Sequence, residues 1–367
     1  MASPVDPMVK TYDMPAPKVS KKVFPISGVF CTIYGLEELP SQTNEVACLY
    51  LMHPRLNTAA CMEGVAGYAI EDWNSRLRDG RVAPSQKNKG LIAVAFDQRN
   101  HGSRLVDKLS NEAWRQGNPK HAQDMFATFQ GTARDVSHLI DLIPSYAFPT
   151  CSHRITSNHV LGVSLGAHAA WSCILHDPRV TSAVIIVGCP DYTNMMAERA
   201  RLSKLPSWNN STPPGSKFLG SESFPQGLVD AVKKYDPAAL FLSHMSDPAV
   251  AGPVRDGTLP DPTEADKGTL RPLIKRCLGG KRVLLISGGK DKLVPYARGE
   301  PFLGWLKRAI APGGWFTDAA VTLEDLIYEE AGHEVTPPMI EQAIRFVGES
   351  LAAGVEGTQA KVRTSKI

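Results

Sequence analysis

The residues Gly162-Val163-Ser164-Leu165-Gly166 decide the fold of this chain. They end the apolar run HVLGVS (159–164) and open a segment, 166–175, that predicts a helix. A G-x-S-x-G between a strand and a helix predicts a nucleophile elbow, a sharp turn at which small residues avoid clashes and the serine projects above a sheet. The start of the helix also favours developing negative charge. The alternative is a serine that caps a helix in a non-catalytic protein.

Further short apolar runs predict buried strands on either side of this motif. They are ACLYLMH (47–53), LIAVAF (91–96), SAVIIVG (182–188) and RVLLIS (282–287). Longer amphipathic segments predict helices over 60–77 and 121–143, and a last helix that begins at Pro337. This alternation is typical of βαβ units, so the sequence predicts an α/β fold with a mostly parallel central sheet flanked by helices.

The interval 191–281 interrupts this alternation with stretches rich in proline, glycine and polar residues, around a helical stretch at 228–235. We interpret it as a cap inserted into a core formed by 1–190 and 282–352, followed by a flexible tail at 353–367. Six large apolar residues of this cap are expected either to line a pocket or to pack the cap on the core: Trp208, Phe218, Phe224, Leu228, Phe241 and Met245.

A serine hydroxyl is a weak nucleophile at neutral pH, so it needs a base and a carboxylate that orients the base. After a nucleophile elbow the expected chain order is serine, acid, histidine. Asp291, in LLISGGKDKLVP, follows a predicted strand, and His333, in EEAGHEVTPP, precedes the last helix. Asp191, at the end of another predicted strand, is the alternative acid and is less favoured.

The motifs GVSLG, GGKDKLVP and GHEVTP resemble those of serine hydrolases with the α/β-hydrolase fold, over residues 45–190 and 280–350. The segment FDQRNHGSR (96–104) is similar to the D-x-R-x-H-G stretch of many members. This resemblance implies that Asp97, Arg99 and His101 support the elbow and take no part in the reaction. The overall likeness is to esterase- and lipase-like proteins of filamentous fungi, including those of toxin and other secondary-metabolite pathways.

Acyl transfer also needs donors for the oxyanion of the tetrahedral intermediate. One is the amide of the residue after the nucleophile, Leu165, and the other comes from the loop after the third strand, LMHPRLNTA (51–59). Pro54 has no N–H, so Arg55 is the predicted second donor. Alternatively, the Arg55 guanidinium meets a carboxylate or carbonyl of the substrate, or pairs with a nearby acid at the surface.

The expected reaction is hydrolysis of a carboxylic ester, lactone or thioester of a small lipophilic acyl substrate. Two alternatives remain: acyl transfer on the same triad, and a non-catalytic ligand-binding protein on the same scaffold. Epoxide and haloalkane hydrolases are disfavoured because they need a carboxylate nucleophile. No cofactor is expected, since the chain has no G-x-G-x-x-G, P-loop or H-E-x-x-H motif.

The composition of the chain limits which binding partners are expected. The chain has 367 residues and a formal net charge of +3 without long charged blocks, which disfavours nucleic-acid binding. Its seven cysteines have no metal-binding spacing, and no secretory signal or membrane-spanning run is visible, so a protein that is not secreted is expected. The final Ser365-Lys366-Ile367 resembles the S-K-L signal and predicts binding to the peroxisomal import receptor; otherwise the protein is expected in the cytoplasm.

Overall fold

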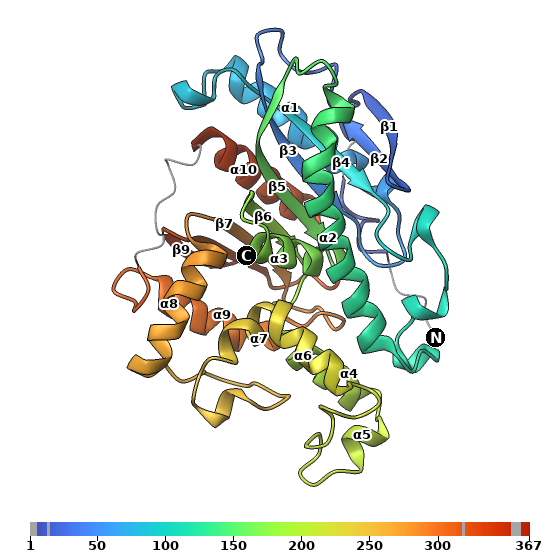
Figure 1. Ribbon diagram of the computed structural model, residues 1–367, viewed down its shortest axis with the longest axis vertical. Coiled ribbons are helices and arrows are strands. Elements are labelled where there is room, and N and C mark those ends of the chain that lie inside the picture. Colours follow the sequence, from blue (N-terminus) through green and yellow to red (C-terminus); the bar gives the residue numbers. More distant parts are fainter. Residues whose placement is uncertain (1–5, 13–14, 318–319, 354–360) are drawn as a thin grey trace.

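The computed structural model describes residues 6–12, 15–317, 320–353 and 361–367. These residues form a nine-stranded sheet in the order β1-β2-β4-β3-β5-β6-β7-β8-β9 (Figure 1). The strands are β1 (Lys21–Ile26), β2 (Val29–Tyr34), β3 (Glu45–Met52), β4 (Lys89–Phe96), β5 (Arg154–Val163), β6 (Val180–Ile186), β7 (Arg282–Gly288), β8 (Thr322–Tyr328) and β9 (Lys361–Lys366). Only the pairs β1-β2 and β2-β4 are antiparallel, so the predicted mostly parallel sheet is confirmed.

Helices cover both faces of the sheet. They are α1 (Glu63–Arg78), α2 (His121–Ala147), α3 (Leu165–His176), α4 (Tyr192–Leu202), α5 (Pro206–Asn209), α6 (Gln226–Tyr235), α7 (Pro237–Leu242), α8 (Glu264–Leu278), α9 (Tyr296–Ile310) and α10 (Pro337–Ala353). Helices α1 and α10 share a core with Ala47, Leu49 and Leu51 of β3, while α2, α3, α8 and α9 share a second core with Cys48 and Tyr50. This alternation along one strand explains why β3 is apolar throughout: it is buried on both faces.

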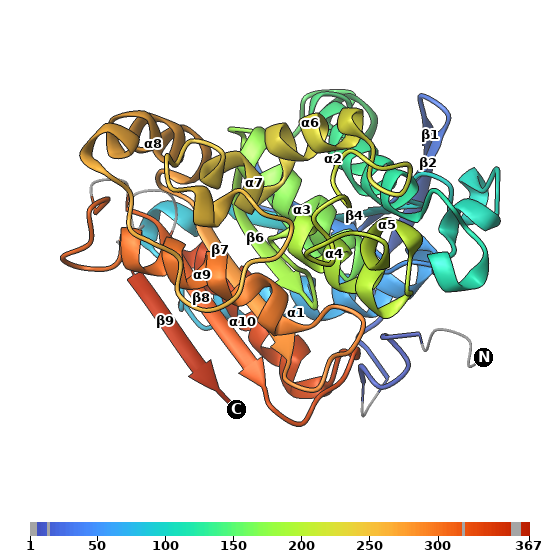
Figure 2. The ribbon, with the colours of Figure 1, turned by 90° about the horizontal axis from the view of Figure 1, so that it is seen from below.

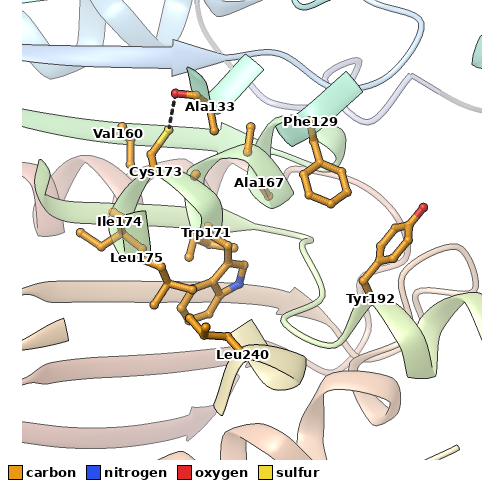
Figure 3. Close-up of a cluster of buried hydrophobic side chains, with 14 of the residues drawn as sticks. Phe129, Ala133, Val160, Ala167, Trp171, Cys173, Ile174, Leu175, Tyr192 and Leu240 are labelled. Carbon is orange, nitrogen blue, oxygen red and sulfur yellow. Dashed lines mark hydrogen bonds between the residues drawn. The ribbon is translucent and has the colours of Figure 1, made fainter. Parts of the chain in front are cut away.

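Helix α3 lies in the middle of the second core, and its residues from Leu165 to Leu175 are all buried. Figure 3 shows Trp171 of α3 facing Leu240 of α7, and Cys173 beside the carbonyl oxygen of Ala133 in α2. A helix that is apolar on every side is expected only in such surroundings. Because packing fixes α3, it also fixes the residue at its N-terminus, Ser164.

The segment between β6 and β7 contains α4 to α8 and covers the interval 191–281, for which a cap was expected. Figure 2 shows α6, α7 and α8 along one side of the molecule. Helix α8 packs against α3, so this part of the segment belongs to the layer that covers the sheet. The six apolar residues expected to line a pocket or to pack are all buried in the second core, where Phe218 contacts the rings of Trp208 and Phe224.

The expectation of a flexible tail is wrong for the last residues. Residues 354–360 of that tail lie outside the described residues, but 361–366 form β9, a parallel strand at the edge of the sheet beside β8 (Figure 2). The Ile367 amide donates to the Ile327 carbonyl at 2.8 Å, and the Glu329 amide donates to the Ile367 carbonyl at 2.9 Å. The edge of β8 offers unpaired amides and carbonyls, and this extended segment satisfies them.

Both outer strands of the sheet carry exposed lysines, Lys21 and Lys22 on β1 and Lys361 and Lys366 on β9. Among the described helices, none combines the length and the apolar character needed to cross a membrane.

Candidate active site

Ser164 occupies the turn between β5 and α3. Its backbone has φ 54° and ψ −111°, a conformation that is unfavourable for any residue with a side chain. The Ser164 amide donates a hydrogen bond of 2.9 Å to the Ile186 carbonyl at the end of β6. The turn is therefore held against the neighbouring strand, and it is the sharp bend that the motif predicts.

The two glycines of the motif are needed because backbone atoms approach them closely. A Cβ atom at Gly162 would lie 2.0 Å from the carbonyl oxygen of Gly166. A Cβ atom at Gly166 would lie 2.1 Å from the carbonyl oxygen of Met52 at the end of β3. Any side chain at either position would push the turn away from the sheet, so the glycines let α3 begin directly above β3 and β5.

The structure brings Ser164, His333 and Asp291 together. The distance from Ser164 Oγ to His333 Nε2 is 2.9 Å, and the distance from His333 Nδ1 to Asp291 Oδ2 is 2.7 Å. The Asp291 side chain is fully buried and that of His333 is 12% exposed. The three residues lie at the carboxyl ends of β5, β7 and β8, which is the end of a parallel sheet where ligand sites usually form.

The Asp291 carboxylate is fixed by its own loop. Its Oδ1 accepts hydrogen bonds from the amides of Leu293, at 2.8 Å, and Val294, at 2.9 Å. Because an ionised carboxylate only accepts hydrogen bonds, His333 Nδ1 is the donor and the neutral ring leaves Nε2 free to accept. This arrangement can take a proton from the Ser164 hydroxyl.

Asp191, the alternative acid, has different partners. Both of its oxygens accept from Arg255 Nη1, at 2.7 and 2.8 Å, and Oδ1 also accepts from the Asn194 amide at the start of α4. Asp191 and Arg255 are both buried. The side chain bonded to His333 is that of Asp291, so Asp191 serves as an ion-pair partner and helix cap.

Leu165 and Arg55, the predicted oxyanion donors, both line the cavity at Ser164. Neither backbone amide donates a hydrogen bond to another described residue. Both amides are therefore available to a ligand, as an oxyanion site requires. The Arg55 guanidinium donates to the Asn111 carbonyl at 2.5 Å and forms no ion pair with a described acid, which excludes the surface pairing considered above.

Asp97, Arg99 and His101, which the resemblance implies support the elbow, connect neighbouring loops. Asp97 accepts from the amides of Ala59, at 2.8 Å, and Ser103, at 2.7 Å, and Arg99 pairs with Asp135 of α2 at 2.9 Å. The His101 ring packs against the ring of His53, 5.5 Å between centroids. These contacts tie the loop after β4 to the loop that carries Arg55.

His53 lies beneath the Arg55 loop and stays uncharged. Its Nδ1 lies 2.7 Å from the Pro54 carbonyl, and its Nε2 accepts from the Gln98 amide at 3.0 Å. Burial lowers the pKa of His53 to about 4. The ring therefore acts at neutral pH as a fixed connection between the β3 and β4 loops.

A cavity of about 320 Å³ opens at Ser164 and His333. Its apolar walls come from the loops after β3 and β7, from the segment before α2, from α2 and from α4: Pro54, Trp114, Met125, Leu202, Leu293 and Val294. None of the six apolar cap residues named above lines this cavity, so they pack and do not contact a ligand at Ser164. Three further residues of the wall, Trp114, Met125 and Arg199, lie in no motif that would single them out in the sequence.

Comparisons with known proteins agree with this architecture. TT1662 from Thermus thermophilus is 17% identical with a TM-score of 0.52, over 92% of this chain and 100% of that one. A 2,6-dihydroxy-pseudo-oxynicotine hydrolase is 14% identical with a TM-score of 0.46, over 95% and 72%, and an arylesterase is 10% identical with a TM-score of 0.44, over 94% and 87%. At 17% identity, the likeness to TT1662 shows the fold alone.

Sequence comparison identifies the family. No curated protein matches the chain. The sequence profile of the alpha/beta hydrolase family matches residues 65–349, which include the elbow, the acid loop and the histidine loop. The chain therefore belongs to the alpha/beta hydrolase family.

Proposed function

We propose that the protein is a serine hydrolase that cleaves a carboxylic ester, lactone or thioester of a small lipophilic acyl substrate. The observation that carries the proposal is the continuous hydrogen-bonded line from Ser164 through His333 to Asp291, with contacts of 2.9 and 2.7 Å. This line ends in a cavity with both apolar and polar walls, next to two unused amide donors. Nucleophile, base, orienting acid and oxyanion donors are thus all available at one place.

In the first half-reaction, Ser164 Oγ attacks the acyl carbon while His333 Nε2 takes the hydroxyl proton. The amides of Leu165 and Arg55 donate to the oxyanion, and the N-terminus of α3 favours its negative charge. His333 then gives the proton to the leaving group, and an acyl-enzyme remains. Asp291 holds the ring in the required tautomer and stabilises the imidazolium that forms.

In the second half-reaction, water attacks the acyl-enzyme and His333 Nε2 takes the proton of that water. Collapse of the second tetrahedral intermediate releases the acid and returns the proton to Ser164. An alcohol or amine in place of water would give the acyltransferase alternative, and product analysis with added alcohols separates the two reactions.

The proposal is tested with a fluorophosphonate probe, which labels activated serines. We expect labelling of the wild-type protein and none of Ser164→Ala, with p-nitrophenyl esters of increasing chain length, lactones and thioesters then defining the acyl group. A folded protein that neither reacts with the probe nor hydrolyses any of these substrates would support the ligand-binding alternative.

We also propose that the protein is imported into peroxisomes through Ser365, Lys366 and Ile367. Because these residues lie in or next to β9, a receptor could bind them only after they leave β8. Imaging of an N-terminally tagged protein tests this. Deletion of 365–367 and addition of two residues after Ile367 are both expected to abolish a peroxisomal signal, and an unchanged distribution in both would contradict it. The role in a toxin or secondary-metabolite pathway stays a prediction.

A further inference from the structure

The cavity at Ser164 is lined by four cationic side chains: Arg55, Arg115, Arg199 and Lys292. No acidic residue of the described chain is among its lining residues. In the chain as a whole, by contrast, 40 Lys and Arg are nearly balanced by 37 Asp and Glu. The charge of the cavity is therefore local, and its positive sign favours a negatively charged ligand.

Arg199 of α4 is held only by uncharged partners. Its Nη1 lies 3.2 Å from His121 Nε2 and 3.1 Å from Met125 Sδ, and its Nη2 donates to the Leu293 carbonyl at 2.8 Å. None of the described acids lies within ion-pair distance of this guanidinium. A guanidinium has five N–H donors, so several of them remain for a ligand.

Arg55 is a second cation of the cavity wall that is held by an uncharged group. It comes from the loop after β3, and its contact with the Asn111 carbonyl also involves no counter-charge. Burial, together with the charge of Arg55, lowers the pKa of Arg199 to about 10, although Asp291 opposes this shift. Burial also lowers the pKa of Arg55, and Glu112 opposes that shift. Both groups stay charged at neutral pH, and each is costly to keep desolvated without an anion.

Two other arginines of the chain, Arg201 and Arg255, are paired with carboxylates. Arg201, two residues from Arg199 on the same helix, pairs with Glu198 at 2.7 Å. Arg255 pairs with Asp191 at 2.7 Å in the interior. Among these arginines, the one without an acidic partner lines the cavity, so its charge is available to an anionic substrate.

We propose that the substrate is an acyl compound whose far end carries a carboxylate, and that Arg199 and Arg55 bind this carboxylate while Ser164 attacks the ester carbonyl. The inference rests on the proposed hydrolase function and adds the substrate class. A planar guanidinium can bind both oxygens of a carboxylate, which fixes the direction of the acyl chain as well as its charge. The apolar walls contributed by Met125, Leu202 and Val294 then contact the carbon chain between the two ends.

The test compares two p-nitrophenyl esters with six-carbon acyl chains, the monoester of adipic acid and the hexanoate. We expect a kcat/KM at least tenfold higher for the adipate monoester in the wild-type protein. Arg199→Met is expected to lower kcat/KM for the adipate monoester by about 10- to 100-fold, mainly through KM, as expected for a lost hydrogen bond to a charged group. The value for the hexanoate is expected to change less than threefold.

Arg201→Met is the matched control, because it removes an arginine from the same helix outside the cavity. It is expected to leave both substrates within twofold of the wild type. Arg199→Lys keeps the charge and is expected to recover part of the preference for the adipate monoester. The rate of fluorophosphonate labelling verifies that each variant is folded around an activated serine.

A second arm compares hexanoyl-CoA with hexanoyl-N-acetylcysteamine, which has the same thioester and no phosphates. If Arg199→Met weakens only the CoA substrate, the anion is a phosphate and the carboxylate proposal is wrong. Equal losses on the adipate monoester and the hexanoate would assign Arg199 a structural role and also overturn it. A protein that fails to react with the probe and with every ester would instead contradict the hydrolase function itself.

Discussion

The Ser164 cavity and the Asp191–Arg255 ion pair lie at the same end of the sheet but differ in how their charges are satisfied. Asp191 follows β6 and Asp291 follows β7, and both carboxylates are buried. The Asp191 oxygens accept from Arg255 and Asn194. Asp291 instead bonds a histidine that faces a cavity, and that cavity contains arginines without acidic partners among the described residues.

This difference separates a structural charge from a functional one. A buried ion pair whose members satisfy each other has nothing left to offer a ligand, whereas a charge held by neutral groups keeps its field and its donors for an incoming molecule. Residue type and position after a strand were the same for both acids, so only their partners distinguish them. The following predictions test this distinction.

The largest effect is expected from Asp291→Asn. The Asn oxygen would accept from the amides of Leu293 and Val294, so its NH2 group would face His333 Nδ1 and donate to it. The ring would then adopt the wrong tautomer, and kcat/KM for a p-nitrophenyl ester would fall by about 10⁴-fold. The substitution keeps the side-chain shape, and thermal unfolding should change little. Activity close to that of the wild type would show that another residue orients His333.

Asp191→Asn is expected to lower the stability of the protein and to leave its activity nearly unchanged. Removing one member of a buried ion pair costs about 3–5 kcal/mol of the free energy of unfolding. The interaction of Arg255 with the buried Asp236 remains, so a value near the lower end is expected. The kcat/KM of the folded protein should stay within about threefold of the wild type. Urea unfolding and ester hydrolysis measure the two quantities, and a large loss of activity without a loss of stability would make Asp191 the catalytic acid.

A smaller loss of stability is expected when both members of the pair are replaced, by Asp191→Leu with Arg255→Met. Apolar residues of similar size can replace a buried ion pair at little cost, so the remaining loss is about 1–2 kcal/mol, largely from the missing cap of α4. The comparison with Asp191→Asn under the same urea conditions measures the cost of the uncompensated charge. A double variant that is less stable than the single variant would contradict this reading.

The smallest effect concerns His121 in the cavity wall. Burial and the charges of Arg199 and Arg55 hold the pKa of His121 well below its ordinary value. Below about pH 6.5 the unfolded chain binds a proton at His121 that the folded protein does not bind, so the free energy of unfolding decreases as the pH falls. Histidine NMR should show His121 neutral at pH 6 in the wild type.

Arg199→Met removes one of the charges that disfavour the imidazolium, so it should raise the pKa of His121. Unfolding of His121→Gln at pH 7.5 and 5.5 should show a smaller pH dependence than that of the wild type. A His121 that titrates near pH 6.5 in the wild type would contradict the description of the cavity as a site of uncompensated positive charge.

Much of the parallel core could be predicted from the sequence, because strands buried on both faces read as short apolar runs. The outer strands could not. β1 has the sequence KKVFPI and β9 has KVRTSK, and their polar composition reflects their position at the edges. β8 was also missed, because its sequence TLEDLIY places Glu324 and Asp325 in a fully buried strand, where Arg345 and Lys307 compensate their charges.

The residues Ser164, Asp291 and His333 could be singled out from the sequence because each lies in a short motif after a strand. Arg199 could not, since TNMMAERARL reads as an ordinary helix with a charged outer face. In the folded protein Arg199 lines the cavity, whereas Glu198 and Arg201 of the same helix lie outside it. The large apolar residues of the expected cap were candidates for a pocket lining because apolar side chains suit both a pocket and a core. All six are buried in the second core, and Phe224 and Met245 also line a separate cavity of about 190 Å³.

The lysines of the two outer strands have a consequence for the protein at high concentration. An open sheet can in principle extend from one molecule to the next through its free edges. Here either edge of a second copy would bring basic strand against basic strand, β1 with Lys21 and Lys22 or β9 with Lys361 and Lys366. Lys21, Lys361 and Lys366 each pair with an acid of their own chain, so repulsion between copies is weakened. An added strand would still have to desolvate these charged side chains, and this cost opposes end-to-end growth of the sheet.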